Sequence, residues 1–256
     1  QDLIASAKTS MVDHFGAKYP TYQNKGDGKE TITVEHLLTM SSGLYADAND
    51  GRSPGREGWL KQSPDFVQFV LDLPMNFVPG EKYVYNSAAA YMAGAMVEVA
   101  SGQTLSDFAD QHLFRPLNIK GYYWTKGAKN TTYGMGGLFL TARDFLKFGT
   151  LYLQNGKWQG KQIVSERWVR ESMKQRFDID GPPFLQTGYG YLWLIADRKV
   201  RGKEYRVVYA SGNGGNILAM VPEFNLAVAF QQSAYGQGYP HYRAFMAIDS
   251  VIEACL

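Results

Sequence analysis

The sequence contains a single cysteine, Cys255, among its 256 residues. One cysteine cannot form an intramolecular disulfide, and it cannot supply the thiolates of a structural zinc cluster. At the penultimate position of a helical tail, we interpret it as a small apolar residue. The cysteine content leaves the redox compartment open.

An excess of charge of one sign is also missing. The chain carries 26 Lys and Arg against 24 Asp and Glu, so the formal net charge is +2, and the two signs are interspersed. Nucleic acids and anionic membranes attract clustered basic residues, and we therefore expect neither as a partner. No segment approaches the ~20 consecutive apolar residues that a bilayer-spanning helix needs, so we expect no membrane span.

Several catalytic motifs are absent. The four histidines are scattered along the chain: His14, His36, His112 and His241. None belongs to an HExxH pair, which argues against a zinc hydrolase, and there is no GxSxG nucleophile elbow. The glycine-rich stretches 134–137 and 212–215 match neither a phosphate loop nor a dinucleotide fingerprint. We expect no metal and no organic cofactor.

The chain does have the apolar content and the helix-start signals of a globular protein. Apolar residues make up 45% of the sequence, and 256 residues suit one large domain. Ser or Thr, or Asp after Ser-Pro, precedes apolar residues at helical spacing at five places: Thr33, Ser63–Asp65, Thr104, Thr141 and Ser165. The segment 87–99 has Ala and Met on all sides, which predicts a helix buried within a helical layer. The polar segments 20–32 and 44–63 are typical of surface loops.

The character of the sequence changes in its last third. Four β-branched or aromatic runs, separated by short turns, predict an antiparallel meander: 189–197, 204–211, 216–222 and 226–232. A last apolar-periodic segment, 241–255, predicts a closing helix. Helices from about 30 to 175, followed by strands from about 186 to 256, indicate a mixed α+β fold with a helical layer, an antiparallel sheet and a flanking C-terminal helix.

A polar triplet, Tyr85-Asn86-Ser87, stands between an extended stretch and the small-residue helix. One interpretation is local: Ser87 is the helix N-cap, its hydroxyl accepting from a backbone N–H of the first turn, and Tyr85 is a packed aromatic whose hydroxyl binds backbone. The other is that the triplet is presented to a cleft. The residues by themselves leave both interpretations open.

Four motifs then follow one another in a recognisable order: 31–44 (TITVEHLLTMSSGL), 79–87 (PGEKYVYNS), 136–144 (GGLFLTARD) and 209–215 (YASGNGG). This arrangement resembles the serine β-lactamase-related hydrolases, a superfamily with class C β-lactamases, D-alanyl-D-alanine peptidases, penicillin-binding proteins, esterases and 6-aminohexanoate-oligomer hydrolases. The resemblance covers nearly the whole chain. It implies a single domain over 1–256 with a β-lactamase/transpeptidase-like fold.

The resemblance also implies a mechanism. In the family, a serine of an S-x-x-K motif attacks a carbonyl and becomes acylated, while the lysine and the tyrosine of a Y-x-N motif move protons. Tyr85 matches that tyrosine and is expected to be catalytic. The third motif position is Ser87 instead of Asn, with Asn86 one place earlier. We expect Ser87 to act in the site, and Asn86 to bind substrate.

The remaining site residues follow from the last motif and from nearby aromatics. Ser211, Gly212, Asn213 and Gly214 are expected to bind substrate beside an oxyanion position, in a cleft shared with Tyr85. Ala210 replaces the usual Lys or His, which argues against recognition of a substrate carboxylate. The alternative for Ser211-Gly212 is an ordinary turn.

Tyr45, Tyr123 and Trp124 would suit an apolar acyl group, although aromatics are more often core. Ser41-Ser42-Gly43 is interpreted as a helix end and not as a nucleophile.

The nucleophile of the family is missing. No lysine in the chain has a serine three places before it. In the family, the S-x-x-K helix comes shortly before a segment like 3–12, so we expect the N-terminal part of the domain to be absent from this chain. Without it, an apolar face and a strand edge should be open, and the chain should be poorly stable by itself.

Two functions follow. The first is a serine hydrolase of amide or ester bonds, acting through an acyl-enzyme on a small-molecule or peptide substrate. Its Ser and Lys would come from a further N-terminal segment of the same protein, so that this chain alone is inactive. The second is a non-catalytic module that binds a peptide or peptidoglycan. The resemblance favours a periplasmic or secreted protein.

Overall fold

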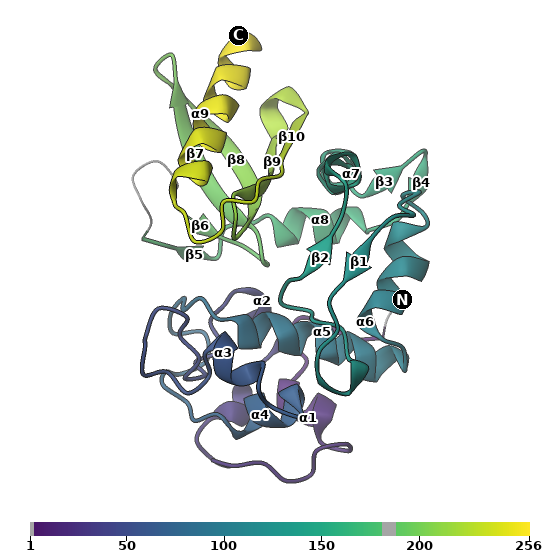
Figure 1. Cartoon of the computed structure of the whole chain (residues 1–256), viewed down its shortest axis with the longest axis vertical. Helices are drawn as coiled ribbons and strands as arrows, with labels where there is room; N and C mark the ends of the chain where they lie inside the picture. The colour runs from purple at the N-terminus through teal and green to yellow at the C-terminus, as the bar shows by residue number, and fades with distance from the viewer. Residues whose placement is uncertain (1–2, 181–187) are drawn as a thin grey trace. The chain divides into compact units, whose positions relative to one another are not determined.

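The computed structural model describes residues 3–180 and 188–256 (Figure 1). The chain divides into two units, which are described separately. The first comprises Gln1–Arg115 and Tyr122–Phe139, and the second comprises Pro116–Gly121 and Leu140–Leu256. The last two helices of the predicted helical region therefore belong to the same unit as the sheet.

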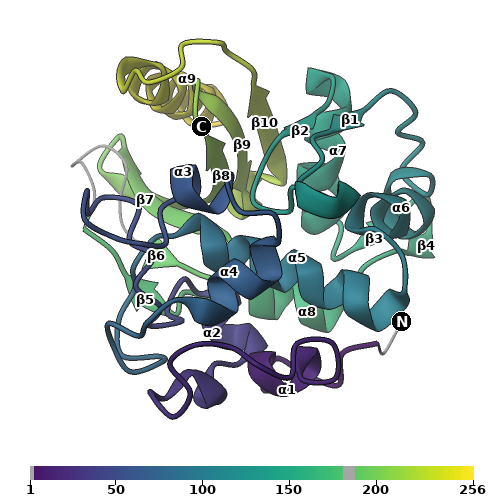
Figure 2. The same ribbon diagram turned by 60° about the horizontal axis from the view of Figure 1, so that its bottom comes forward.

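The first unit is helical. Its elements are α1 (Met11–Phe15), η1 (Lys29–Thr31), α2 (Val34–Leu38), α3 (Glu57–Leu60), α4 (Phe66–Asp72), α5 (Ser87–Ser101), α6 (Leu105–Ala109), η2 (Asp110–Phe114), β1 (Tyr123–Trp124), η3 (Ala128–Asn130) and β2 (Leu138–Phe139). Helices α1 to α4 and α6 all contact α5, which is the centre of this unit (Figure 2). No helix in the described ranges has both the length and the apolar character needed to cross a bilayer.

Three of the predicted helix starts are confirmed by side-chain caps within the first helical turn. The Thr33 hydroxyl accepts from His36 N–H, the Asp65 carboxylate from Gln68 N–H, and the Thr104 hydroxyl from Asp107 N–H. Each of these bonds satisfies a backbone donor that the first helical turn leaves unpaired.

The prediction that 87–99 is a helix buried within the helical layer is confirmed for all but its last residue. Tyr91, Met92 and Met96 are buried, whereas Val99 is 37% exposed. The small side chains of this helix therefore leave one side open near its C-terminal end.

The segment 44–63 is more ordered than a surface loop. It contains α3, and both Leu44 and Leu60 are buried. The segment 20–32 is likewise tied down, because the Lys29 ammonium is fully buried and donates to Leu71 O at 2.7 Å. Packing of these two segments against the helices gives α3 a defined position, and α3 carries a residue of the candidate site.

The second unit is built on a six-stranded antiparallel sheet in the order β10-β9-β8-β7-β6-β5. Its strands are β5 (Phe177–Asp178), β6 (Gly188–Tyr189), β7 (Leu194–Val200), β8 (Lys203–Gly212), β9 (Asn216–Val221) and β10 (Leu226–Phe230). The other elements are α7 (Ala142–Leu153), β3 (Lys157–Trp158), β4 (Lys161–Gln162), α8 (Glu166–Ser172), η4 (Pro222–Phe224) and α9 (Tyr239–Ala254). The meander and the closing helix were both predicted, and the α+β fold class is confirmed.

Helices cover the two faces of this sheet. On one face, Phe245 of α9 packs edge-on against Tyr209 of β8, with ring centroids 4.9 Å apart. On the other, Gly149 of α7 lies against Leu218 and Ala227, so close that an added Cβ would come within 3.1 Å of both side chains. Burial of alternate side chains on both faces fixes the register of the strands.

Strand β10 is an edge of the sheet among the described strands. Its sequence, LAVAF, has no charged residue, and all five residues are partly exposed. That this edge is left open by absent N-terminal strands stays a prediction. Edges of this kind favour pairing with another strand. The low stability of the chain stays a prediction.

Candidate active site

The backbone of Tyr85 is held on both sides by hydrogen bonds. Val84 N–H donates to Met40 O at 2.8 Å, and Ala48 N–H donates to Tyr85 O at 3.1 Å. The Tyr85 side chain is 46% exposed, and its hydroxyl has no hydrogen-bond partner among the described residues. The phenol is therefore accessible and stands on a backbone that hydrogen bonds hold in place. This differs from the local interpretation, in which Tyr85 is a packed aromatic whose hydroxyl binds backbone.

Asn86 is the N-cap of α5, a position that the local interpretation gave to Ser87. Its Oδ1 accepts from Ala89 N–H at 2.7 Å, and its Nδ2 donates to Val84 O at 2.9 Å. The residue is 1% exposed. Because the amide is buried and bound to backbone at both ends, the geometry does not support Asn86 as a substrate-binding residue. Its role is to fix the turn between Tyr85 and the helix.

Ser87, the first residue of α5, faces a carboxylate that the sequence analysis missed. Its hydroxyl donates to Glu57 Oε2 at 2.9 Å. The other oxygen, Oε1, accepts from the Tyr133 hydroxyl at 2.6 Å and from Lys61 Nζ at 2.6 Å. One carboxylate thus joins α3, the start of α5 and the strand connection at 131–137. The cluster formed by Glu57, Lys61, Ser87 and Tyr133 is called the Glu57 cluster below.

The electrostatics of the Glu57 cluster keep its carboxylate ionised. Burial alone would raise the pKa of Glu57, but hydrogen bonds from Lys61, Tyr133 and Ser87 hold it below its usual value. Burial, followed by the hydrogen bond to Glu57, raises the pKa of Tyr133 to about 12. The Lys61 ammonium, bonded to Glu57, has a raised pKa and lies 5.3 Å from the centre of the Tyr133 ring. At neutral pH the cluster is one anion, one cation and two neutral hydroxyls.

The negative charge of Glu57 also affects the pKa of Tyr85. Burial and then the charge of Glu57 raise the pKa of Tyr85 above its ordinary value. A phenol with a raised pKa is protonated at neutral pH, so Tyr85 is a proton donor unless a cation approaches it.

The sequence carried little signal for the Glu57 cluster. Glu57 and Lys61 have i, i+4 spacing, which is common on any exposed helix. Tyr133 precedes the glycine-rich stretch 134–137 without a motif of its own. Only the folding of three distant segments brings these side chains together.

Tyr45 and the two serines after α2 are engaged locally. The Tyr45 hydroxyl donates to Asp50 Oδ2 at 2.9 Å, and this bond raises the pKa of Tyr45. Ser41 and Ser42 are each 1% exposed. Burial makes these serines unsuited to attack a substrate, in agreement with the interpretation that they are not nucleophiles.

The predicted residues 211–214 lie at the end of β8 in the second unit. Pairing of β8 with β7 ends at Tyr209, whereas pairing with β9 continues to Gly212. Ser211 and Gly212 are exposed, so one edge of this backbone is open among the described strands. Because consecutive N–H groups of a strand point to opposite edges, one of these two N–H groups faces the open edge. That they share a cleft with Tyr85 stays a prediction.

The turn after Gly212 is tightly held. Asn213 Oδ1 accepts from Gly236 N–H at 2.9 Å. Gly214 and Gly215 have φ angles of 91° and 87°, and a Cβ on Gly215 would lie 2.4 Å from Pro240 Cβ. Glycine is thus required at 215 by both conformation and space. The prediction that Asn213 and Gly214 bind substrate is not tested. The side-chain oxygen of Asn213, Oδ1, already accepts a hydrogen bond from Gly236 N–H.

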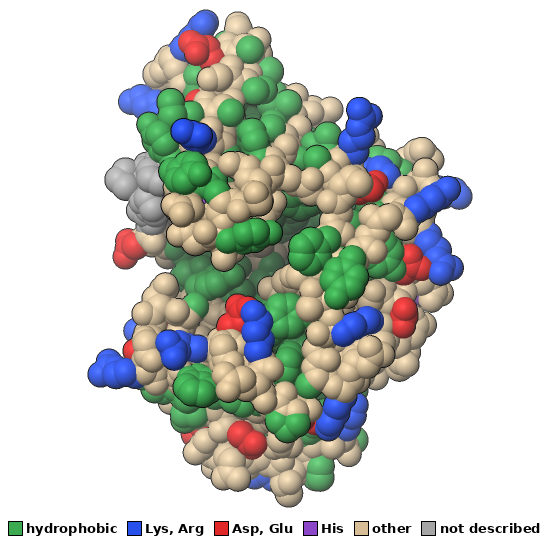
Figure 3. All heavy atoms as spheres, viewed as in Figure 1, with side chains coloured by type: hydrophobic (Ala, Val, Ile, Leu, Met, Phe, Trp, Pro, Cys, Tyr) green, Lys and Arg blue, Asp and Glu red, His purple; other side chains and the backbone are tan. Residues whose placement is uncertain are grey.

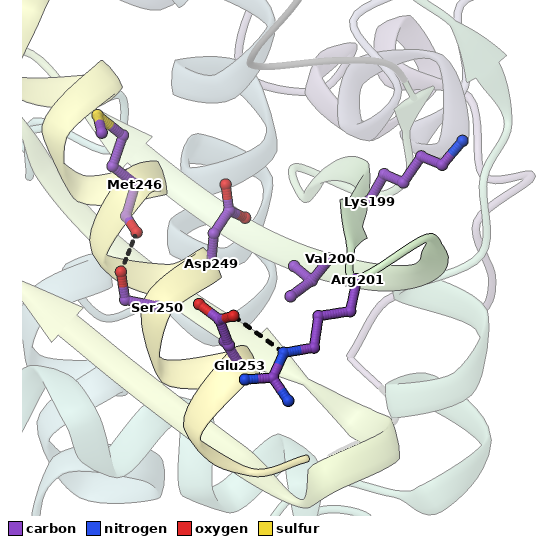
Figure 4. Close-up of a pocket in the computed structure, with 7 residues that line it drawn as sticks. All are labelled: Lys199, Val200, Arg201, Met246, Asp249, Ser250 and Glu253. Carbon is purple, nitrogen blue, oxygen red and sulfur yellow. Dashed lines mark hydrogen bonds and ion pairs between the residues drawn. The ribbon is translucent and has the colours of Figure 1, made fainter.

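A shallow hollow in the second unit contains none of these residues (Figure 4). It is lined by Lys199, Val200, Arg201, Met246, Asp249, Ser250 and Glu253. Its acids are paired, Asp249 with Arg198 and Glu253 with Arg201. On the face shown in Figure 3, Lys and Arg are scattered among acidic and neutral side chains. Within the described ranges, no three His, Cys, Asp or Glu gather into a metal site.

The pH dependence of stability tests the Glu57 cluster. A carboxylate whose folded pKa lies below its unfolded value of 4.5 stabilises the fold above that value, and this contribution is lost as pH falls through the folded pKa. The Glu57 side chain is 43% exposed, and solvent screens ion pairs and hydrogen bonds at such a position. Glu57→Gln should therefore lower the free energy of unfolding by about 0.5–1.5 kcal/mol at pH 7. Urea unfolding should show a smaller difference at pH 3.5. Glu166→Gln, which breaks an exposed pair with Arg170, is the control. An equal Glu57→Gln effect at both pH values would contradict this assignment.

The titration of Tyr85 tests its link to Glu57. In the 256-residue chain, NMR of ¹³Cζ-labelled tyrosine should give Tyr85 a pKa above its ordinary value of 10.0. Removing the anion in Glu57→Gln should lower that pKa, while Glu166→Gln should leave it unchanged. Tyr85→Phe assigns the resonance. If the Tyr85 pKa lies below 10.0 in the unmodified chain, the electrostatic assignment is wrong.

Comparison with known proteins identifies the family of this chain. The family model described as Beta-lactamase matches residues 12–248. The chain is 23% identical to an uncharacterized protein of Alkalihalophilus pseudofirmus, covering 89% of this chain and 68% of that protein. It is 22% identical to the D-alanyl-D-alanine-carboxypeptidase/endopeptidase AmpH of Escherichia coli, covering 82% of this chain and 59% of that enzyme.

The fold has matches among solved structures. The octameric penicillin-binding protein homologue from Pyrococcus abyssi superposes with a TM-score of 0.73 at 23% identity, over 97% of this chain and 60% of that one. The chain thus spans about two thirds of the length of these relatives. Because the family model matches most of the sequence, the chain belongs to the Beta-lactamase family, a family of hydrolytic enzymes.

Proposed function

We propose that this chain supplies the proton-transferring tyrosine, Tyr85, of a serine hydrolase site. The site cleaves amide or ester bonds through an acyl-enzyme. The observation that supports this most directly is the accessible Tyr85 phenol, which has no partner among the described residues and lies on a backbone fixed from both sides. The nucleophilic serine and its lysine would come from outside residues 1–256, since no lysine in the chain has a serine three places before it.

The proton chemistry of Tyr85 follows from its surroundings. Burial and Glu57 raise its pKa, so the phenol enters the reaction protonated. It can donate its proton to the leaving nitrogen or oxygen as the acyl-enzyme forms. To accept a proton it needs a cation nearby, and the lysine that accompanies the serine in the S-x-x-K motif would supply one.

The steps balance as an acyl transfer. The serine oxygen attacks the carbonyl carbon, the bond to the leaving group breaks, and the serine proton passes to that group through Tyr85. Water then attacks the acyl-enzyme, which releases the acid and returns the proton to the serine. On the family resemblance, a backbone N–H at 211–212 in the second unit is the proposed donor to the oxyanion.

The substrate class is narrowed by Ala210. An alanine at this motif position supplies no cation for a substrate carboxylate. Small esters and linear amides are therefore proposed over penicillin-like β-lactams. Tyr123 is 62% exposed and could contact an apolar acyl group, whereas the Trp124 indole donates to Tyr133 O and Gly136 O and supports the hairpin.

A binding module for a peptide or peptidoglycan is the alternative. The absence of a serine–lysine pair within the 256 residues favours it. Such a module would use the same surfaces without turnover.

The compartment proposed for either function is the periplasm or the cell exterior, on the family resemblance alone.

Kinetics of the protein expressed from its full reading frame test the proposal. Tyr85→Phe removes only the phenolic oxygen and should lower kcat for an alkyl ester, whose alkoxide leaving group needs a proton, by about 10²–10⁴-fold, the range for loss of a general acid–base. Tyr239→Phe, at an exposed tyrosine of α9 outside the proposed site, should leave kcat within about twofold and is the control. Unchanged kcat in Tyr85→Phe would overturn the role of Tyr85. Absence of turnover in the unmodified protein, with retained peptide binding, would favour the alternative.

A further inference from the structure

The outer face of α9 is partly apolar, although it lies on the side of the helix away from the sheet. The inner face packs into the core of the second unit through five buried residues: Pro240, Ala244, Phe245, Ile248 and Ile252. The outer face carries Tyr239, Tyr242 and Met246, and each of these side chains is 46–51% exposed. Single exposed apolar side chains are common, but three on successive turns of one helix form a patch.

The patch continues into a regular seam along the whole helix. The residues of the seam alternate at spacings of three and four: Tyr239, Tyr242, Met246, Asp249 and Glu253. This spacing sets side chains in one line, as in helices that pack side by side. The first half of the seam is aromatic and the second half is acidic.

The charges of this face complement the same face of a second copy that runs in the opposite direction. Arg243 lies over the Tyr239 ring, 5.1 Å from its centre, and forms no ion pair among the described residues. If two α9 helices pack antiparallel with Met246 against Met246, position 243 of each copy faces position 249 of the other. Arg243 then meets Asp249 of the second copy at two symmetric places. A parallel arrangement would instead set Arg243 against Arg243 and Glu253 against Glu253.

The hollow beside the acidic half of the seam suits the aromatic half (Figure 4). One wall comes from α9 and the other from the end of β7 and the turn after it: Met246, Asp249, Ser250 and Glu253, and Lys199, Val200 and Arg201. Its volume is about 320 Å³, which can admit one aromatic side chain. In the antiparallel arrangement, Tyr242 of the second copy lies opposite Ser250. Its ring can cover apolar atoms of the hollow while its hydroxyl stays at the charged rim.

We propose that α9 is the contact surface of a symmetric dimer, in which a second copy packs antiparallel across Met246 and places Tyr242 in the hollow. The dimer goes beyond the proposed hydrolase function and does not depend on it. One helix face is small compared with the roughly 1,200–2,000 Å² that stable interfaces bury, so the dimer is weak. We expect a Kd of about 1–100 µM.

Sedimentation equilibrium of the protein expressed from its full reading frame tests the association. The unmodified protein should pass from monomer to dimer over a concentration range that spans the expected Kd. Arg243→Glu sets like charges against each other at both symmetric contacts and should raise Kd at least about tenfold. Arg167→Glu makes the same change at an exposed arginine of α8 and should leave Kd within about twofold.

A cysteine at the centre of the contact tests its symmetry. In a Cys255→Ser background, Met246→Cys brings two thiols together at the twofold axis and should give a disulfide-linked dimer on mild oxidation. Glu253→Cys lies on the same face but opposite Tyr239 of the second copy, so it should give far less of this product. This measurement keeps the test valid if Arg243→Glu fails to fold.

Three results would overturn the dimer: a monomer throughout the concentration range, an unchanged Kd in Arg243→Glu, or equal crosslinking at positions 246 and 253. A monomer in which the cysteine of Met246→Cys resists maleimide would show that another segment of the same protein covers the face. Failure to hydrolyse an ester bears only on the proposed function, so the two claims fail separately.

Discussion

One half-buried carboxylate, that of Glu57, joins three segments of the first unit around the candidate site. It accepts from Lys61 in its own helix, from Ser87 at the start of α5 and from Tyr133 in the strand connection. A carboxylate shared by three donors is stable only while each donor stays in place, because removing one leaves charge partly unsatisfied in a partly buried position. The geometry around Tyr85 therefore depends on contacts that are remote in sequence.

The second constraint is the junction before α5. Asn86 uses both ends of its amide to close the turn, and backbone bonds from Val84 and Ala48 fix the extended residues in front of it. The phenol of Tyr85 thus projects from a backbone with little freedom. Catalytic groups gain from this kind of support, because a fixed position spares the entropy of ordering the group during reaction.

Local features of the fold were predictable from the sequence, and features that depend on distant contacts were not. The caps at Thr33 and Thr104 are decided within one helical turn, and the meander follows from runs of apolar residues between turns. The N-cap of α5 was assigned one residue too late, because Asn86 and Ser87 are both good caps and only packing chooses between them.

The candidate site shows the same limit. Tyr85 and Ser87 were found through the order of the motifs, and residues 211–214 through the glycines that end β8. Glu57 was missed because two of its three partners lie 30 and 76 residues away in sequence, with no spacing rule to connect them. The burial of Asn86 was also unforeseen, since an asparagine at this motif position can either contact a ligand or cap a helix.

The central claim is that Tyr85 serves a serine supplied from outside residues 1–256. Labelling with a fluorophosphonate probe, followed by peptide mapping of the protein expressed from its full reading frame, tests it most directly. The account predicts one labelled serine, in a peptide that precedes Gln1 and carries a lysine three residues after that serine. A label on a serine within residues 1–256, or no label at all, would contradict it.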